Sequence, residues 1–238
     1  MPANILIPFA VPYADRIIKG DRFHGRLPLQ TLLIHGAGAS ERGRFAPLRS
    51  TLHGCGIGTT AFDCVGHGET GGALHESSLC SRTRQAEAVI NAPHSAVPRA
   101  VVGTSMGAYN AIKLLETQAL EALILVVPGV YTPEAYDIPF GSGFSAVIRQ
   151  ERSWEQSDAW GILRKFTGRL LVIAAEHDTV IPREIPERLF QSAHQASWRK
   201  LCVVPGAEHN RLFSLLAERP IEFEKTMDLI LDCLDPAV

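Results

Sequence analysis

The sequence predicts an α/β protein built on a mainly parallel, doubly wound β-sheet flanked by helices. Short apolar runs bounded by turn-forming residues alternate with longer stretches of helical periodicity. Most runs are apolar at nearly every position, which is typical of strands covered on both faces. The 238 residues, 46% of them hydrophobic, are enough for one large core. We therefore expect one domain that covers residues 1–238.

The individual elements follow from these patterns. Six segments have the buried-strand pattern: 31–35, 59–63, 99–104, 122–127, 170–175 and 200–204. Residues 106–116 follow one strand directly and carry apolar residues on one helical face. A second helix is predicted from Pro220, a favoured first helical residue. The first thirty residues are less regular and leave open an antiparallel hairpin near Gly20 and Asp21.

One long stretch, 129–167, breaks the alternation. It shows no strand pattern, is rich in aromatic residues, and contains a loop-like Gly-Ser-Gly at 141–143 followed by helical periodicity. A connection this long inside a compact domain is usually functional or carries helices of its own. We expect a small helical lid inserted over the strand ends.

Composition and charge narrow the class of protein. The net charge is −2, and the charged residues are interspersed, so no basic stripe predicts a nucleic-acid or membrane partner. The first residues make a poor signal peptide, and no apolar run is long enough to span a bilayer. The five cysteines are scattered without metal-ligand spacing. We expect a cytoplasmic protein with a small-molecule substrate and neither metal nor cofactor.

The strongest chemical signal is the pentapeptide Gly-Thr-Ser-Met-Gly at 103–107, which ends an apolar strand and opens a helix. A serine on such a tight turn has strained backbone angles, and side chains at Gly103 and Gly107 would collide with neighbouring chain. The turn lifts the Ser105 hydroxyl above the sheet. Ser105 is therefore the predicted nucleophile, whereas a merely structural glycine-rich turn is the alternative.

Several segments together resemble the α/β-hydrolase superfamily from residue 31 onward. They are His-Gly-Ala-Gly at 35–38, Phe-Asp-Cys-Val-Gly-His-Gly-Glu at 62–69, the pentapeptide at 103–107, and the segments at 176–182 and 205–210. The resemblance implies the α/β-hydrolase fold and a serine, acid, histidine order. It does not identify the substrate, because this fold hosts many chemistries. Thr70 stands where members often have serine.

The resemblance assigns partners to the serine. His209 lies just after the last predicted strand, where the family places the base that takes the serine proton. Asp178, shortly before Val-x-Pro, is the predicted acid that orients the imidazole, with Glu176 as the fallback. The oxyanion hole is expected from the backbone N–H groups of Met106 and Ala37.

These assignments predict a serine hydrolase that cleaves a carboxylic ester or thioester of a small, mainly apolar substrate through an acyl-enzyme. The same three side chains would also serve carbon–carbon bond, peptide, lyase or perhydrolase chemistry. A non-catalytic binding protein with this fold is the alternative of another class. The substrate, the scissile bond and the oligomeric state stay open.

Overall fold

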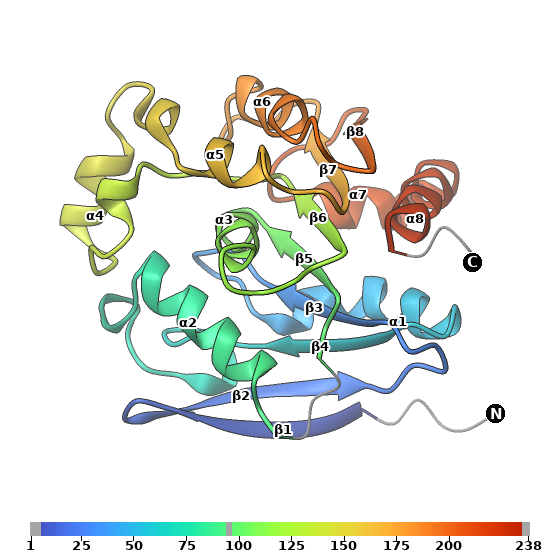
Figure 1. The fold of residues 1–238 in the computed structure, drawn as a ribbon, viewed down its shortest axis with the longest axis horizontal. Coiled ribbons are helices and arrows are strands. Elements are labelled where there is room, and N and C mark those ends of the chain that lie inside the picture. Colours follow the sequence, from blue (N-terminus) through green and yellow to red (C-terminus); the bar gives the residue numbers. More distant parts are fainter. Residues whose placement is uncertain (1–5, 94–96, 235–238) are drawn as a thin grey trace.

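The computed structural model describes residues 6–93 and 97–234 and contains an eight-stranded sheet (Figure 1). The strand order is β1-β2-β4-β3-β5-β6-β7-β8. The strands are β1 (Leu6–Tyr13), β2 (Arg16–Phe23), β3 (Gln30–Ile34), β4 (Gly58–Phe62), β5 (Ala100–Thr104), β6 (Ala122–Val126), β7 (Arg169–Ala175) and β8 (Trp198–Val204). The six strands β3 to β8 pair in parallel, which confirms the predicted sheet.

The N-terminal hairpin left open by the sequence exists, and its turn lies at Ala14 and Asp15 rather than at Gly20 and Asp21. Strands β1 and β2 are antiparallel and turn between Tyr13 and Arg16. Gly20 lies inside β2, where a Cβ atom would approach the ring of Phe9 to 2.3 Å and the carbonyl oxygen of Ala61 to 2.5 Å. The glycine therefore permits close packing within the sheet rather than a turn.

Helices connect the parallel strands and cover both faces of the sheet. The α-helices are α1 (Ala46–Gly54), α2 (Leu79–Ile90), α3 (Met106–Leu114), α4 (Ser142–Ile148), α5 (Ala159–Leu163), α6 (Glu184–Ser192), α7 (Leu212–Glu218) and α8 (Pro220–Leu234). The helix predicted over 106–116 ends two residues early, and the one predicted from Pro220 begins there. Within residues 6–93 and 97–234, no helix is both long and apolar enough to cross a membrane.

The two faces of the sheet support two cores, and side chains alternate between them along each strand. On β5, Val101 joins the core under α2 and α3, whereas Ala100 and Val102 join the core under α1, α7 and α8. On β6, Leu123 and Ile124 divide in the same way. This double burial explains why the strands read as continuous apolar runs.

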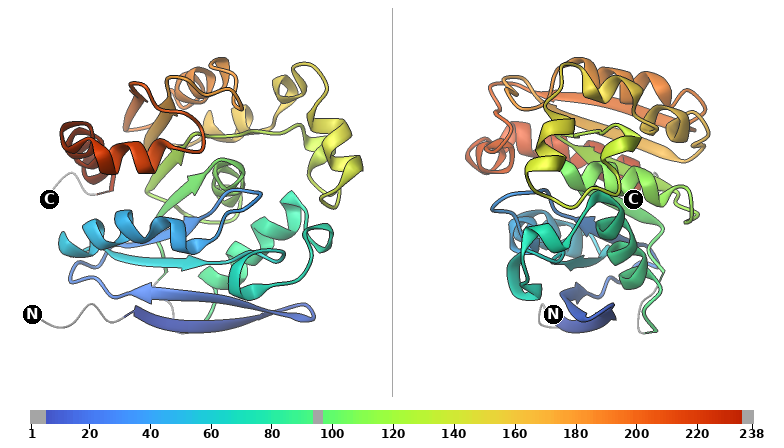
Figure 2. Two further views of the ribbon diagram at one scale, coloured as in Figure 1. Left: turned by 180° about the vertical axis from the view of Figure 1, so that it is seen from behind. Right: turned by 90° about the vertical axis from the view of Figure 1, so that its left-hand side faces the viewer.

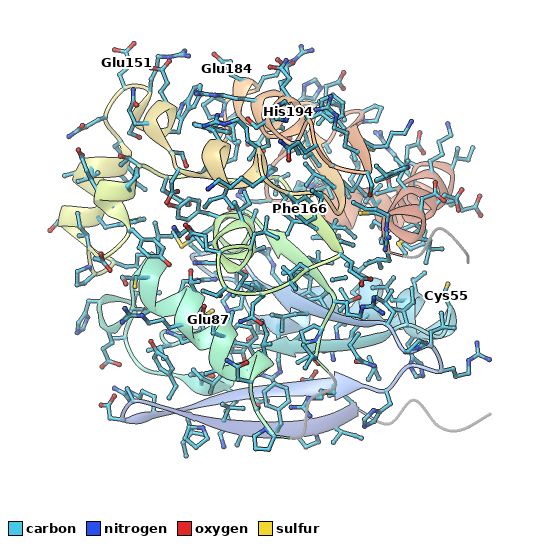
Figure 3. The ribbon with its side chains drawn as sticks, in the orientation of Figure 1. Cys55, Glu87, Glu151, Phe166, Glu184 and His194 are labelled. Carbon is cyan, nitrogen blue, oxygen red and sulfur yellow. The ribbon has the colours of Figure 1, made fainter. Side chains whose placement is uncertain are left out.

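Segment 129–167 contains helices and no strand, as expected. Its elements are the 3-10 helices η4 (Pro133–Ala135) and η5 (Ser153–Gln156) together with α4 and α5. Figure 2 shows this yellow segment on the opposite side of the molecule from α8. Phe166 is buried, and Glu151 is exposed at the outer rim of the molecule in Figure 3. Its role as a lid over the strand ends stays a prediction.

Candidate active site

Ser105 occupies a strained turn between β5 and α3. Its φ and ψ are 52° and −117°, a conformation that non-glycine residues rarely adopt. Three backbone hydrogen bonds impose it: the Ser105 N–H donates to the Val126 carbonyl at 2.9 Å, and the Ser105 carbonyl accepts from Ala108 at 3.0 Å and Gly129 at 3.1 Å. These bonds to the surrounding chain therefore stabilise the strained turn and hold the Ser105 hydroxyl in place.

The two glycines of the pentapeptide are required by close backbone contacts. A Cβ atom at Gly103 would lie 2.5 Å from the Gly107 carbonyl oxygen and 2.6 Å from the Ala108 Cα. A Cβ atom at Gly107 would lie 2.3 Å from the carbonyl oxygen of Ile34. These distances are far shorter than normal van der Waals contact, so helix α3 approaches β3 and β5 only because both positions lack side chains.

The structure brings the three predicted side chains into one hydrogen-bonded chain. The Ser105 Oγ lies 3.0 Å from the His209 Nε2, and the His209 Nδ1 lies 2.8 Å from an Asp178 carboxylate oxygen. The residues come from loops after β5, β7 and β8, whose carboxyl ends share one edge of the sheet. The side chains of Asp178 and His209 are each only 9% exposed, so little water competes for these hydrogen bonds.

The second carboxylate oxygen of Asp178 accepts two backbone hydrogen bonds. The donors are the N–H groups of Val180 at 2.9 Å and Ile181 at 2.8 Å. Burial by itself would raise the pKa of Asp178. The bond from His209 and the two backbone bonds outweigh it, so the pKa lies below its usual value. Asp178 therefore stays ionised beside the imidazole and aims one oxygen at it.

Glu176, the fallback acid, lies in a different arrangement. Its exposed carboxylate accepts a 2.7 Å hydrogen bond from the Gly206 backbone N–H, and its contacts do not include His209. This bond ties the loop after β7 to the loop after β8, which carries His209. The geometry thus places Asp178, and not Glu176, on the imidazole.

The two backbone N–H groups expected to form the oxyanion hole belong to segments that meet at Ser105. Met106 is the first residue of α3, where the N–H has no acceptor within the helix. Ala37 lies in the loop after β3 and lines the same cavity as Ser105. A Cβ atom at Gly36 would lie 3.2 Å from the Ser105 Cβ, so this loop passes very close to the serine.

A buried histidine and arginine support this loop from below. His35 accepts the Cys64 N–H at its Nε2 (3.0 Å), so its Nδ1 carries the proton and donates to the Gly36 carbonyl (2.7 Å). Burial, reinforced by the nearby Arg82 guanidinium, holds the pKa of His35 well below its usual value. Arg82 donates to the carbonyls of His35 and Gly36. His35 is thus a neutral structural residue.

Paired charges anchor the adjoining 3-10 helix η1 (Arg42–Phe45). The Arg42 guanidinium is paired with Asp63, Asp21 and Glu69, and Arg49 shares Asp21. Asp63 also accepts the backbone N–H groups of Arg42 and Glu69 at 2.8 and 3.0 Å. The segment that resembled the superfamily at 62–69 is therefore architectural.

Comparison with protein families identifies the chain. A family model described as serine aminopeptidase, S33, matches residues 29–156, more than half of the sequence. The chain belongs to this family. The match includes Ser105 and ends before Asp178 and His209, which join the serine only in the folded structure. A comparison with curated proteins gave no match.

The S33-family chain is also similar to several solved α/β-hydrolase structures. The esterase Pf2001 of Pyrococcus furiosus has a TM-score of 0.73 and 16% identity, with 98% of this chain and 94% of that chain covered. A monoacylglycerol lipase of Paleococcus ferrophilus has a TM-score of 0.66 and 18% identity over 86% and 96% of the two chains. Est1E from Butyrivibrio proteoclasticus, described with ferulic acid bound, has a TM-score of 0.67 and 19% identity over 93% and 99%. These likenesses show the shared fold.

Ser105 opens into a cavity of about 470 Å³ in this family member. Apolar side chains that line it are Phe45, Val127, Val180, Leu212 and Phe213. They come from η1, the end of β6, the loop after β7 and the segment after His209. A larger surface groove of about 1300 Å³ between the segment after α3 and helices α5 and α6 contains none of Ser105, Asp178 and His209.

None of the residues in 129–167 lines the cavity at Ser105. The aromatic side chains of this segment therefore do not form the walls of that cavity. Phe144 and Trp160 are buried in the core on the α2 and α3 side of the sheet. The apolar walls of the cavity come from other elements, so the expectation of an apolar substrate now depends on them.

Two arginines near the site were not singled out from the sequence. Arg44 lines the cavity, and Arg82 supports the loop after β3. Arg82 did carry a signal, because it lies on the face of α2 that Leu79, Ala86 and Val89 bury. Arg44 carried none. Within 6–93 and 97–234, no group of three or more His, Cys, Asp or Glu side chains is arranged to hold a metal ion.

Proposed function

We propose that this protein is a serine hydrolase that cleaves a carboxylic ester or thioester of a small, mainly apolar substrate. One observation carries the proposal: Ser105, His209 and Asp178 form a continuous hydrogen-bonded chain that ends at a cavity with apolar walls. A serine hydroxyl becomes an effective nucleophile when an adjacent base removes its proton and a carboxylate orients that base.

The first half of the proposed reaction forms an acyl-enzyme. The Ser105 Oγ attacks the carbonyl carbon while its proton passes to the His209 Nε2. The negative charge that develops on the carbonyl oxygen is stabilised by the N–H groups of Met106 and Ala37. Collapse of this intermediate breaks the bond to the leaving oxygen or sulfur, which takes the proton from His209.

Water completes the cycle. It gives one proton to the His209 Nε2, and its oxygen attacks the acyl carbon. The bond to the Ser105 Oγ then breaks, and the serine regains the proton from His209 as the carboxylic acid leaves. Asp178 remains ionised throughout and stabilises the imidazolium in both halves, consistent with its lowered pKa.

Structural neighbours described as an esterase and a monoacylglycerol lipase support an ester substrate. The description of the matching family, serine aminopeptidase, favours peptide bonds as the second candidate. Both reactions use the same acyl-enzyme, and they differ in the leaving group. Carbon–carbon cleavage, lyase and perhydrolase chemistry have no comparable observation in their favour.

A fluorophosphonate probe tests the nucleophile without knowledge of the substrate. We expect the probe to label wild-type protein on Ser105, as located by peptide mapping, and to leave the Ser105→Ala variant unlabelled. The variant should keep the wild-type unfolding curve, because the side chain contributes little to the core. Labelling at another residue, or wild-type turnover by Ser105→Ala, would contradict the assignment.

The scissile bond is tested with matched substrates. We expect p-nitrophenyl esters of short acyl chains and acyl-CoA thioesters to be hydrolysed faster than amino-acid p-nitroanilides. The Ser105→Ala variant measures the background rate in each assay. Faster hydrolysis of the p-nitroanilides would replace the ester with the peptide candidate.

A further inference from the structure

The cavity at Ser105 has one strongly basic side chain and no acidic one. Among the described residues that line it, Arg44 is the only arginine, lysine, aspartate or glutamate. The other lining side chains are neutral polar or apolar, apart from His209 and the neutral His35. A bound substrate therefore meets a single fixed positive charge beside apolar walls.

The fold holds Arg44 beside the cavity through two other residues of the same 3-10 helix. Arg42 is anchored by paired carboxylates, and Phe45 is buried with 2% exposure. Both lie on η1 with Arg44, so the backbone at position 44 is fixed on either side. The side chain of Arg44 is exposed. The backbone of Arg44 is therefore held in place by its helix, and its side chain projects from a fixed position.

Arg44 also differs from Arg42 in having no acidic partner. Among the described residues, Arg42 forms three ion pairs and two side-chain hydrogen bonds to carboxylates, whereas Arg44 forms no ion pair and no side-chain hydrogen bond. Glu41, the nearest carboxylate in sequence, forms no ion pair with Arg44 among the described residues, and Asp21, Asp63 and Glu69 are paired with Arg42. The Arg44 guanidinium is thus free to bind a ligand.

We propose that Arg44 binds a carboxylate on the substrate, so that the preferred substrates are short esters or thioesters with a terminal acid group. A guanidinium presents two parallel N–H donors that match a carboxylate, and one positive charge matches one negative charge. The apolar walls would contact the chain between this carboxylate and the scissile carbonyl. This inference rests on the proposed function and names its substrate class.

Two esters of equal chain length test this specificity. They are p-nitrophenyl pentanoate and the mono-p-nitrophenyl ester of glutaric acid, which differ by the terminal carboxylate. We expect wild type to favour the glutarate ester and Arg44→Gln to lower the ratio of the two kcat/KM values by about tenfold or more, mainly through KM. Arg44→Lys should keep part of the preference. Arg211→Gln, which removes an exposed arginine near His209, is the matched control and should keep the full ratio.

Binding to the Ser105→Ala variant separates this inference from the proposed function. Calorimetry should show tighter binding of the glutarate ester, and addition of Arg44→Gln should abolish the difference. If this holds while wild type hydrolyses neither ester, the proposed reaction fails and the anion site stands. Equal binding of both esters, or a ratio unchanged by Arg44→Gln, would overturn the anion site whether or not turnover occurs.

The guanidinium of Arg82 is fully buried under the loop after β3. Its Nη2 donates to the carbonyl oxygens of His35 at 2.5 Å and Gly36 at 3.2 Å. The Nε and Nη1 atoms have no hydrogen-bond partner among the described residues, and none of the ion pairs in that part of the chain involves Arg82. A buried cation without a carboxylate costs stability, so its contacts with the loop need an explanation.

The Gly36 carbonyl and the Ala37 N–H belong to one planar, trans peptide unit and point in opposite directions. Donors on that carbonyl therefore fix the direction of the Ala37 N–H. They also polarise the unit, which makes the N–H a stronger donor. The carbonyl receives both the Arg82 Nη2 and the His35 Nδ1. We infer that Arg82 is a positioning residue that orients and strengthens the Ala37 donor for the oxyanion.

Kinetics and stability measured together test this role. We expect Arg82→Met to lower kcat by about tenfold or more with little change in KM, because the donor acts on the transition state. Arg82→Lys, which keeps one charged donor, should recover part of the rate. The exposed Arg84 on the same helix provides the matched control, Arg84→Met.

Two readouts separate positioning from a general structural role. Affinity for a trifluoromethyl ketone, whose oxyanion occupies the proposed donors, should fall in parallel with kcat. The thermal midpoint of Arg82→Met should not fall, because the variant loses an unpaired buried charge. Unchanged kcat, or a loss confined to KM, would overturn the inference. If Arg82→Met does not fold, the same measurements on Arg82→Lys decide it.

Discussion

The sheet edge at Ser105 and segment 129–167 use their side chains in opposite ways. At the edge, polar groups from three loops bond to one another and reach a cavity. In the segment, aromatic rings pack against each other and against the core beside α3. Phe140 and Phe144 meet edge to face at 4.9 Å, and Trp154 and Trp160 do so at 6.4 Å.

A high content of aromatic residues does not by itself locate a binding site. Trp160 is 4% exposed and donates its indole N–H to the Glu155 carbonyl, so its polar atom is satisfied locally. The apolar surface next to Ser105 comes instead from residues outside 129–167, such as Phe213. We therefore expect substitutions at the sheet edge near Ser105 to affect activity and substitutions in 129–167 to affect stability.

The largest effect is expected at the edge. Asp178→Asn should lower kcat/KM for a short ester by about 10³- to 10⁴-fold, because the amide no longer holds the His209 tautomer and imidazolium. Glu176→Gln keeps an oxygen for the Gly206 N–H and should cost less than about tenfold. Steady-state kinetics on the two variants provide the comparison. The reverse ranking would make Glu176 the acid.

A smaller effect, on stability rather than activity, is expected in the segment. Trp160→Ala should lower the free energy of unfolding by about 3–5 kcal/mol, because it leaves a cavity against Trp154 and the α3 side of the core. Urea denaturation measures the change. The kcat/KM for esters at 20 °C, well below the midpoint, should stay within about twofold of wild type. A large loss of activity with normal stability would show that the segment reaches the substrate.

The smallest effect is a pH dependence that belongs to the edge. The pKa of Asp178 in the folded protein lies below the ordinary value of 3.8, so the unfolded chain takes up this proton first as the pH falls. Asp178 thus contributes stability above about pH 5, and that contribution is lost as the pH falls through the folded pKa.

Denaturation at a series of pH values tests this dependence. Between about pH 5 and pH 3, the free energy of unfolding should fall less steeply for Asp178→Asn than for wild type. Trp160→Ala should be less stable than wild type at every pH, but its free energy of unfolding should change with pH as steeply as that of wild type. The pH dependence would then be specific to the sheet edge and not to 129–167. Equal slopes for Asp178→Asn and wild type would show that the His209 and backbone contacts of Asp178 contribute nothing to folding.

Local rules were sufficient for much of the fold. The parallel strands were visible because double burial makes their sequences continuously apolar. The turn at Ser105 was visible because Gly103 avoids a local contact with Gly107, although Gly107 itself avoids Ile34, which is distant in sequence. Gly20 shows the limit of such rules, since it avoids Phe9 and Ala61 across the sheet rather than making a turn.

The six parallel strands, the helices at 106 and 220, and the elbow that presents Ser105 could be predicted from the sequence, because backbone sterics and burial act over short separations. The choice between Asp178 and Glu176, which lie two residues apart on one loop, needed the tertiary structure. The loop after β8 brings the His209 imidazole to Asp178 and the Gly206 N–H to Glu176. The tertiary structure also placed Arg44 at the cavity and Arg82 against the loop after β3. Such contacts join residues tens of positions apart, and packing of whole elements sets their distances.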